Sequence, residues 1–174
     1  VRDRSYITTL GIEADSLEGY LFPETYSFAR GTKPKDVIKA MVDGLHHVWG
    51  SDLQAQAARM NLSLHQVLTL ASVIEKETGA KDERELIAAV FHNRLRKKIP
   101  LQSDPTVIYG LPAFDGNIHK RDLSSLSPYN TYRVQGLPPG PIGSPGADSL
   151  HAALFPAQAS YLYFVSRNDG THHF

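Results

Sequence analysis

Two glutamates, Glu75 and Glu77, lie near the end of a stretch, residues 63–78, that would be apolar over most of the circumference of a helix. Carboxyl groups are seldom buried unless they are paired or have a chemical task. A carboxyl group on an apolar wall has a raised pKa, and it can then act as a general acid near neutral pH. In the simpler alternative, the helix ends near Glu75 and both carboxylates reach solvent or a basic partner.

The stretch that carries these glutamates is predicted to be a buried helix. Ser63 and Gln66 have the spacing of a capping box, and Leu62 and Val67 can form a hydrophobic staple around it. At about 100° per residue the other polar residues fall on one narrow stripe, and the remaining positions are apolar. The stripe consists of His65, Thr69, Ser72 and Lys76. This pattern places both glutamates among apolar neighbours and does not choose between them.

Composition limits the classes of function. The chain has 174 residues, 41% of them hydrophobic, which supports one well-packed domain. Acidic and basic residues both number 18, so the net charge is zero and nucleic acid is not an expected partner. The lack of cysteine excludes thiol nucleophiles, thiolate metal sites and disulfides. No apolar run approaches the roughly 18 residues of a membrane span. Because the chain does not begin with Met, we expect it to be an excised piece.

The segments before the central helix are expected to combine loops and helices. Residues 1–17 are predicted to form a strand pair or the tail of an upstream module. Residues 17–28 are dense in aromatic side chains and predict a structured loop, in which most of the rings pack in the core. A proline in the first turn opens an amphipathic helix over residues 34–49, and residues 51–60 predict a second, shorter helix.

Another helix is expected after the central one. Asp82 and Glu85 have the spacing of a capping box, and apolar residues continue at helical spacing as far as Leu95. The last turn is basic, which is favourable at the negative end of the helix dipole. Most of these cations are expected to be solvated. We expect Arg94 to be the exception, because it could reach back to a buried glutamate.

Turn residues dominate the sequence after residue 99. Residues 101–109 predict a loop that leads into a strand or short helix, and residues 110–123 predict a loop. Residues 136–146, called the Gly/Pro loop here, are mostly Gly and Pro. Proline fixes the backbone angle φ and makes the loop rigid, whereas glycine has no side chain and leaves space beside the backbone. We expect the Gly/Pro loop to form a wall of a ligand groove.

The last segments predict a small sheet. A short helix is expected over residues 148–154, followed by a strand over residues 161–165. The turn formed by residues 168–170 reads Asn-Asp-Gly, a strong hairpin signal, and residues 172–174 would begin the returning strand. The expected fold class is α+β, with a helical, lysozyme-like lobe packed on a small, mostly antiparallel sheet.

Eight segments in order resemble the YceG-like family of endolytic murein transglycosylases. The resemblance covers the chain from about residue 17 to its end. The segments are EGYLFPETY (18–26), LASVIEKET (70–78), VFHNRL (90–95), LQSDPTVIY (101–109), SPYNTY (127–132), GLPPG (136–140), SPGADSL (144–150) and YLYFV (161–165).

The resemblance implies a lyase that cuts peptidoglycan glycan strands between MurNAc and GlcNAc and leaves 1,6-anhydro-MurNAc ends. One acid suffices, because it protonates the glycosidic oxygen and then, as carboxylate, takes the proton of the attacking C6 hydroxyl. Glu75 matches the family's catalytic glutamate. Glu77 is expected to support the site through an ion pair with Arg94 or through the helix terminus. No metal or organic cofactor is expected.

Polarity and position indicate further substrate-binding residues. Three lie in the segment after residue 100 and could line the groove opposite Glu75, and three lie in the segment 127–132 and could contact N-acetyl groups. The alternative for all six is loop scaffolding. These candidates are Gln102, Ser103, Asp104, Tyr129, Asn130 and Tyr132.

The family also implies a cellular setting. Its members are anchored in the inner (cytoplasmic) membrane by one N-terminal helix, act outside the cytoplasm, and release nascent strands beside peptidoglycan synthases. We therefore expect residues 1–17 to be the tail of an upstream LysM-like module or a linker. Residues 18–174 would be the catalytic domain, with its last strand cut short, and the anchor would lie upstream of this chain.

Two other functions stay open at this point. The first is a lysozyme-type hydrolase that uses Glu75 with Asp104 as its second carboxylate. The second is an inactive peptidoglycan-binding module.

Overall fold

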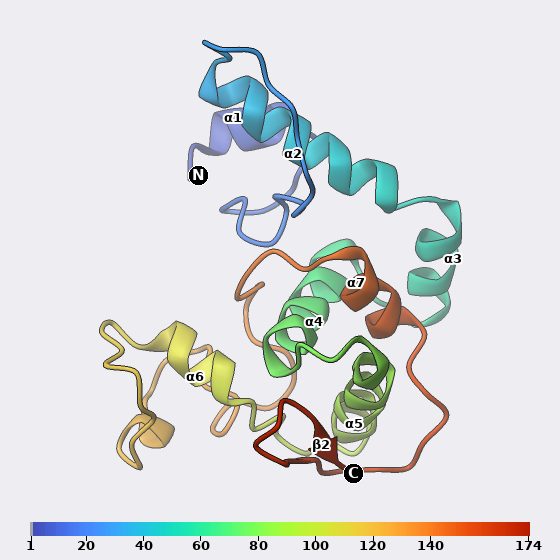
Figure 1. Ribbon diagram of the computed structural model, residues 1–174, viewed down its shortest axis with the longest axis vertical. Helices are drawn as coiled ribbons and strands as arrows, with labels where there is room; N and C mark the ends of the chain where they lie inside the picture. The colour runs from blue at the N-terminus through green and yellow to red at the C-terminus, as the bar shows by residue number, and fades with distance from the viewer. Residues whose placement is uncertain (1) are drawn as a thin grey trace.

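The computed structural model describes residues 2–174, and the chain is mainly helical (Figure 1). Within this range two short strands pair antiparallel, with Val165 opposite His173. The predicted α+β class is confirmed, although the sheet is smaller than expected. The elements are α1 (Arg4–Thr9), α2 (Pro34–Val48), α3 (Ser51–Arg59), α4 (Leu64–Glu77), η1 (Lys81–Glu83), α5 (Arg84–Arg96), α6 (Asp104–Gly110), η2 (Asp122–Ser124), α7 (Ala147–Leu154), β1 (Val165–Ser166) and β2 (His172–His173).

Helix α4 lies at the centre of the fold and contacts α3, α5, α6 and α7 (Figure 1). The predicted capping box is present: Ser63 Oγ accepts the Gln66 N–H at 3.2 Å, and Gln66 Oε1 accepts the Ser63 N–H at 2.9 Å. Every residue from 67 to 74 is buried. The helix continues to Glu77 and ends because Thr78 adopts an extended backbone. Both glutamates therefore belong to the helix.

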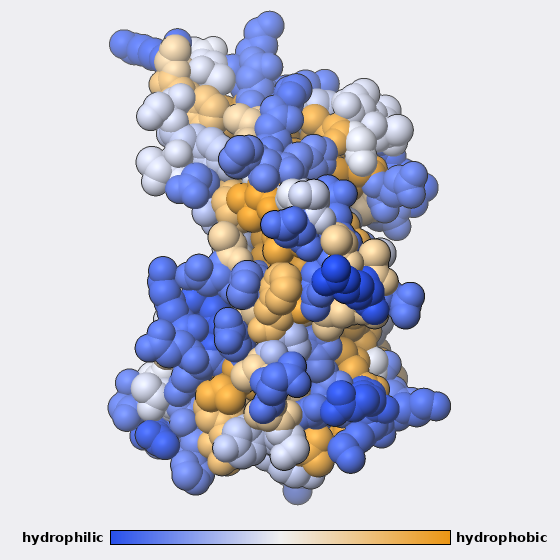
Figure 2. Space-filling view, turned by 90° about the vertical axis from the view of Figure 1, so that its right-hand side faces the viewer, coloured by the Kyte–Doolittle hydropathy of each residue, from blue (hydrophilic) through white to orange (hydrophobic). Residues whose placement is uncertain are grey.

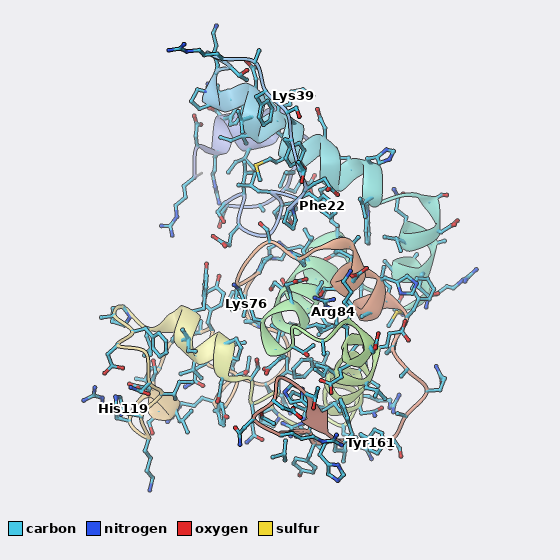
Figure 3. All side chains as sticks on the ribbon, viewed as in Figure 1. Phe22, Lys39, Lys76, Arg84, His119 and Tyr161 are labelled. Carbon is cyan, nitrogen blue, oxygen red and sulfur yellow. The ribbon has the colours of Figure 1, made fainter. Side chains whose placement is uncertain are left out.

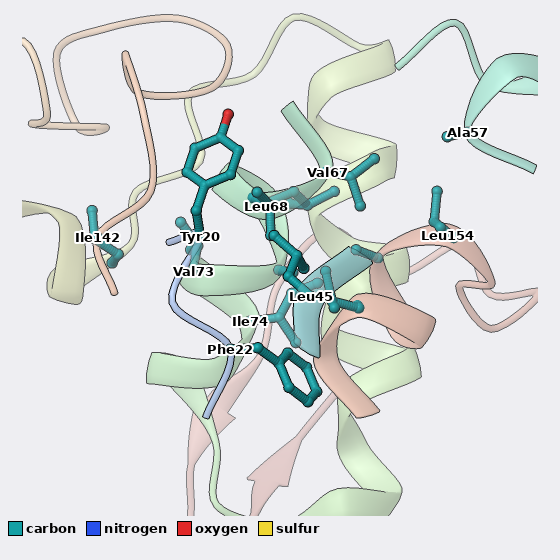
Figure 4. Close-up of a cluster of buried hydrophobic side chains, with 14 of the residues drawn as sticks. Tyr20, Phe22, Leu45, Ala57, Val67, Leu68, Val73, Ile74, Ile142 and Leu154 are labelled. Carbon is teal, nitrogen blue, oxygen red and sulfur yellow. The ribbon is translucent and has the colours of Figure 1, made fainter. Parts of the chain in front are cut away.

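One hydrophobic core joins the N-terminal segments to α4. Tyr20 and Phe22, from the aromatic loop, pack with Leu45 of α2 and Leu68 of α4 (Figure 4). Packing of Tyr20 and Phe22 was expected, whereas Phe28 is 43% exposed. On the face seen in Figure 2, apolar side chains gather near the junction between the part that holds α1 and α2 and the rest of the molecule.

The strand pair considered for residues 1–17 is wrong, because this segment contains helix α1. The Asp3 side chain accepts the Tyr6 N–H at 3.2 Å and thereby caps the helix. Ile7 from α1 is 1% exposed and belongs to the common core. The short alternation of apolar residues therefore did not indicate a strand here, because a side-chain cap starts a helix in the same segment.

The Gly/Pro loop covers the polar stripe of α4. The Ile142 N–H donates to Ser72 Oγ at 3.0 Å, and His65 Nε2 lies 3.0 Å from the Pro139 carbonyl oxygen. Gly19 packs against the other side of this loop. It has a φ of +84°, and a Cβ there would collide with Pro141. Two members of the stripe, His65 and Ser72, therefore bind the loop, whereas Thr69 donates to the His65 carbonyl within the helix and Lys76 is exposed.

Two local predictions near α5 are wrong in detail. The capping box of Asp82 and Glu85 does not form, because η1 occupies this segment and Glu83 holds the N-cap position of α5. The strand predicted from residue 161 begins only at Val165. The carbonyl groups before it bond to α5 side chains instead of a partner strand: Tyr161 O accepts from Asn93 at 2.9 Å, and Leu162 O accepts from Arg94 at 2.6 Å.

Candidate active site

Glu77 lies at the C-terminal end of α4, where its side chain enters a cavity of about 250 Å³. Ser103 Oγ donates a short hydrogen bond to Glu77 Oε1. Segments that are far apart in the sequence enclose the cavity. It is lined by Glu77, Arg94, Leu101, Gln102, Asp104, Tyr132, Phe164, Ser166 and His172.

The surroundings of Glu77 favour its protonated form. Burial raises the pKa of Glu77 to about 7, and the negative charge of Asp104 acts in the same direction. The hydrogen bond from Ser103 and the charge of His172 oppose this rise, but they are weaker. A carboxyl group with this pKa is suited to give up a proton and later take one back near neutral pH.

A buried group of hydroxyls holds Ser103 in place. The Ser103 N–H donates to Thr131 Oγ1 at 3.0 Å, and Thr106 Oγ1 donates to the Ser103 carbonyl at 2.6 Å. The two threonine hydroxyls are 2.8 Å apart. Ser103, Thr106 and Thr131 are all at most 1% exposed. The donor to Glu77 is thus fixed before any ligand binds.

Asp104 and Tyr132 form a second polar pair in the cavity. Tyr132 Oη donates to Asp104 Oδ1 at 2.6 Å. Burial, together with this hydrogen bond to Asp104, raises the pKa of Tyr132, so its hydroxyl keeps its proton. Gln102, which has a φ of +52°, lies beside them. Four of the six predicted substrate-binding residues therefore lie around Glu77.

The other two candidates lie away from this cavity. Asn130 is fully buried, and its amide donates to the carbonyl oxygens of Leu123 (3.1 Å) and Ser125 (2.8 Å). It has no free group for a sugar, so its prediction as a substrate contact is wrong and its scaffolding alternative holds. Tyr129 packs on Tyr109 at 4.7 Å between ring centroids and lines a separate cavity with the Gly/Pro loop.

Glu75 lies in different surroundings from those predicted. Its Oε2 accepts hydrogen bonds from Ser149 Oγ (2.7 Å) and from the Gly146 N–H (3.1 Å), and its Oε1 lies 3.4 Å from Arg84 Nη2. Arg84 is buried where α4, α5 and α7 meet (Figure 3), and it also pairs with Asp148 at 3.5 Å. The wall around Glu75 is therefore polar, and Glu75 ties α4 to α5 and α7.

Among the ion pairs of residues 2–174 there is none between Arg94 and Glu77, so the predicted ion pair is wrong. Its guanidinium donates to the carbonyl oxygens of Leu162 (2.6 Å), Pro100 (3.0 Å) and Leu101 (3.0 Å), and to Gln102 Oε1 (3.1 Å). Arg94 is 6% exposed. It shapes the cavity by joining two backbone segments, the one after α5 and the one before β1, rather than by neutralising the acid.

Sequence reasoning missed His172, Phe164 and Ser166, which complete the cavity. The Asn-Asp-Gly turn correctly predicted that residue 172 would pair with the preceding strand, here with Ser166. Nothing local indicated that this hairpin would fold against the end of α4. Long-range contacts place it there: His172 bonds Glu83, and α5 side chains bond the carbonyl groups before β1.

The raised pKa of Glu77 predicts a specific dependence of stability on pH. Below pH 4.5 the carboxyl is protonated in both the folded and the unfolded chain, and it has no effect. Between pH 4.5 and about 7 the unfolded chain loses this proton first, so folding becomes less favourable as pH rises. The variant Glu77→Gln should therefore gain free energy of unfolding relative to wild type across this window, by at most about 3 kcal/mol.

Chemical denaturation at pH values below and above this window would measure the difference. The exposed Glu24→Gln serves as the matched control and should show no such trend. A stability difference for Glu77→Gln that stays constant with pH would contradict the raised pKa.

The fold and the cavity together define an α+β domain in which one central helix presents a buried acid to a small polar pocket. The chain belongs to the YceG-like family, whose model matches residues 3–174. It is 44% identical over 155 residues to an endolytic murein transglycosylase of Bacillus subtilis (strain 168), covering 88% of this chain and 43% of that protein.

Two further relatives agree with this assignment. An endolytic murein transglycosylase of Streptococcus pneumoniae (serotype 2, strain D39) is 37% identical over 155 residues, covering 86% of this chain and 28% of that protein. The crystal structure of a YceG-like protein from Listeria monocytogenes superposes with a TM-score of 0.84 at 37% identity, covering 95% of this chain and 58% of that one. The chain thus spans less than half the length of the curated relatives described here.

Proposed function

We propose that this chain is the catalytic part of a peptidoglycan lytic transglycosylase. It would cut the glycosidic bond between MurNAc and GlcNAc within a strand and leave a 1,6-anhydro-MurNAc end. The observation that carries this proposal is a carboxyl group with a pKa of about 7, held in a small polar cavity at the end of α4. The names of the relatives, endolytic murein transglycosylases, support the same substrate.

We assign the acid to Glu77, although the motif led us to expect Glu75. Glu77 faces the cavity with one hydrogen-bond donor, Ser103, and its proton is available near neutral pH. Glu75 is occupied by Arg84, Ser149 and the Gly146 N–H. These three contacts engage both carboxylate oxygens of Glu75. A substrate would also have to displace these contacts to reach Glu75.

The proposed reaction needs one acid in two successive roles. Glu77 donates its proton to the glycosidic oxygen as the bond from that oxygen to C1 of MurNAc breaks. The C6 hydroxyl of the same sugar then attacks C1, and the Glu77 carboxylate takes the hydroxyl proton. An intramolecular nucleophile replaces water and benefits from proximity. Ser103 stabilises the carboxylate between the two steps, and Tyr132 and Asp104 offer a donor and an acceptor to the bound sugar.

Asp104 supports one competing reaction, because it lines the same cavity as Glu77. A hydrolase would use one carboxyl group as the acid and the second carboxylate to activate water or to attack. Here, however, Asp104 Oδ1 already accepts the Tyr132 hydroxyl at 2.6 Å. This contact favours a role in binding.

Mass spectrometry of glycan strands digested by the purified protein distinguishes the two reactions. The lyase leaves MurNAc ends that lack one water relative to the hydrolysis product. We expect anhydro ends only, and reducing ends that contain added water would overturn the proposal in favour of the hydrolase. An absence of any product, together with retained binding to strands, would favour a binding module.

The cellular role proposed here is the release of nascent glycan strands outside the cytoplasm, beside peptidoglycan synthases. It would involve a membrane anchor upstream of this chain and rests on the family resemblance. Within residues 2–174, no helix is both long enough and apolar enough to cross a membrane.

A further inference from the structure

His172 lies on β2 and lines the cavity that contains Glu77. Its side chain is held by Glu83, a residue 89 positions earlier in the chain. Glu83 Oε2 lies 2.7 Å from His172 Nδ1, and Glu83 Oε1 accepts the His172 backbone N–H at 2.8 Å. Both side chains are well enclosed, with 10% of the imidazole and 14% of the carboxylate exposed.

The Glu83 carboxylate determines which imidazole nitrogen is free. Burial acts to raise the pKa of Glu83, but its hydrogen bonds from His172 bring the pKa below the ordinary value. An ionised Glu83 accepts hydrogen bonds only, so Nδ1 must carry a proton and donate it. Glu83 is thus the residue that orients the ring.

Nε2 of His172 is left for a ligand. It makes no hydrogen bond with any of residues 2–174. In the same part of the chain, the only fully buried side-chain nitrogen or oxygen atoms without a hydrogen-bond partner are Nε and Nη1 of Arg84. Nε2 is therefore not sealed inside the protein. His172 and Glu77 line the same cavity, so a ligand held there can reach both side chains.

We infer that His172 is a substrate-binding residue whose Nε2 bonds a hydroxyl group of the sugar held in the Glu77 cavity. The inference rests on the function proposed above and deepens it. A sugar hydroxyl can both donate and accept, so the bond forms whether Nε2 is a lone-pair acceptor or a protonated donor. The Phe164 ring packs against the imidazole in a T-shaped arrangement, with 5.1 Å between the ring centroids.

Other charged and titratable groups near this position belong to different elements. Glu83 precedes α5, Glu77 ends α4, and Asp104 begins α6. Arg94 of α5 and Tyr132 complete the set around the cavity. Of these, the closest contact to the imidazole is Glu83, which makes Glu83 the positioning residue and His172 the residue that touches the sugar.

Two substitutions of His172 separate this role from a purely structural one. His172→Asn keeps an amide near the position of Nδ1, where it can bond Glu83, but it has nothing at the position of Nε2. His172→Gln can place an amide near the position of Nε2. We expect His172→Asn to lower kcat/KM by roughly ten- to a hundredfold, mainly through KM, and His172→Gln to recover part of that loss.

The neighbouring His173→Asn is the matched control, because His173 is exposed on the same strand and does not line the cavity. It should leave kcat/KM unchanged. Glu83→Gln should lower kcat/KM in the wild-type background but add little in the His172→Asn background, because Glu83 acts through the imidazole. Thermal unfolding of each variant shows whether a loss of activity follows a loss of fold.

The outcomes separate this inference from the proposed function. If the wild-type protein forms no anhydro ends from purified uncrosslinked strands, the proposed function fails. If the wild type is active and folded His172→Asn keeps the wild-type kcat/KM, the inference about His172 fails alone. It also fails if all three variants of His172 and Glu83 lose activity only in proportion to their unfolding.

Discussion

Glu77→Gln is expected to reduce the formation of anhydro ends by roughly 100- to 10,000-fold while the chain remains folded. Glutamine has nearly the same shape and can still accept the hydrogen bond from Ser103. It has no proton to give to the glycosidic oxygen and cannot later take one from the C6 hydroxyl. Product quantification by mass spectrometry, alongside circular dichroism and strand binding, would measure the effect.

Glu75→Gln is the matched control, because Glu75 lies on the same helix and in the same motif. It should lower the free energy of unfolding by about 1–3 kcal/mol, since the ion pair with buried Arg84 is lost. The rate per folded molecule should stay close to that of the wild type. If Glu75→Gln abolished product formation and Glu77→Gln did not, the motif-based assignment of Glu75 would be right.

Arg94→Met is expected to lower the free energy of unfolding by about 3–5 kcal/mol. The guanidinium bonds three main-chain carbonyl groups and the Gln102 side chain, and all of these partners would lose a donor in a largely buried place. Arg94→Lys should recover only part of this loss, because a single ammonium cannot match the planar fork of the guanidinium. Urea denaturation of the purified variants would give the values.

Lys97→Met, an exposed cation one turn away on the same segment, is the control for Arg94. It should change stability by less than about 0.5 kcal/mol. Equal effects of the two substitutions would mean that Arg94 contributes only charge and that its contacts to the carbonyl groups add nothing.

Features that depend on near neighbours were predictable from the sequence. The capping box of Ser63 and Gln66 involves residues three apart, and Pro34 sets its own helix start. The Asn-Asp-Gly turn likewise forms within a few residues. The capping box of Asp82 and Glu85 failed although its spacing was correct. A local pattern can be satisfied by more than one backbone, and here a 3-10 turn occupies the segment.

The surroundings of the two glutamates could not be predicted, because distant segments create them. On a helical wheel both residues have apolar neighbours. In the fold, Glu75 contacts Ser149 of α7 and the backbone N–H of Gly146, the residue that precedes this helix. Glu77 instead meets Ser103 and a hairpin near the end of the chain. Identical residue types on one helix thus differ in chemistry because of which loops cover them.

Arg94 illustrates the same limit. A basic side chain near an acidic motif suggests an ion pair, and the sequence offers no sign that main-chain carbonyl groups would compete. The unpaired extended segment before β1 and the segment after α5 both turn their oxygens toward the guanidinium. The charges in the sequence could not reveal these acceptors, because every residue has a main-chain carbonyl group.

The cavity around Glu77 also has a consequence for how activity arises during folding. Ser103 is 26 positions from Glu77, and His172 reaches back 89 positions to Glu83. Closing such long loops is slow compared with forming a helix. Helix α4 can thus form while Glu77, its last residue, is still exposed to solvent and has the pKa of an ordinary carboxyl group. The raised pKa depends on burial, which distant segments of the chain complete, so a clipped or half-made chain would carry the motif without the enclosed acid.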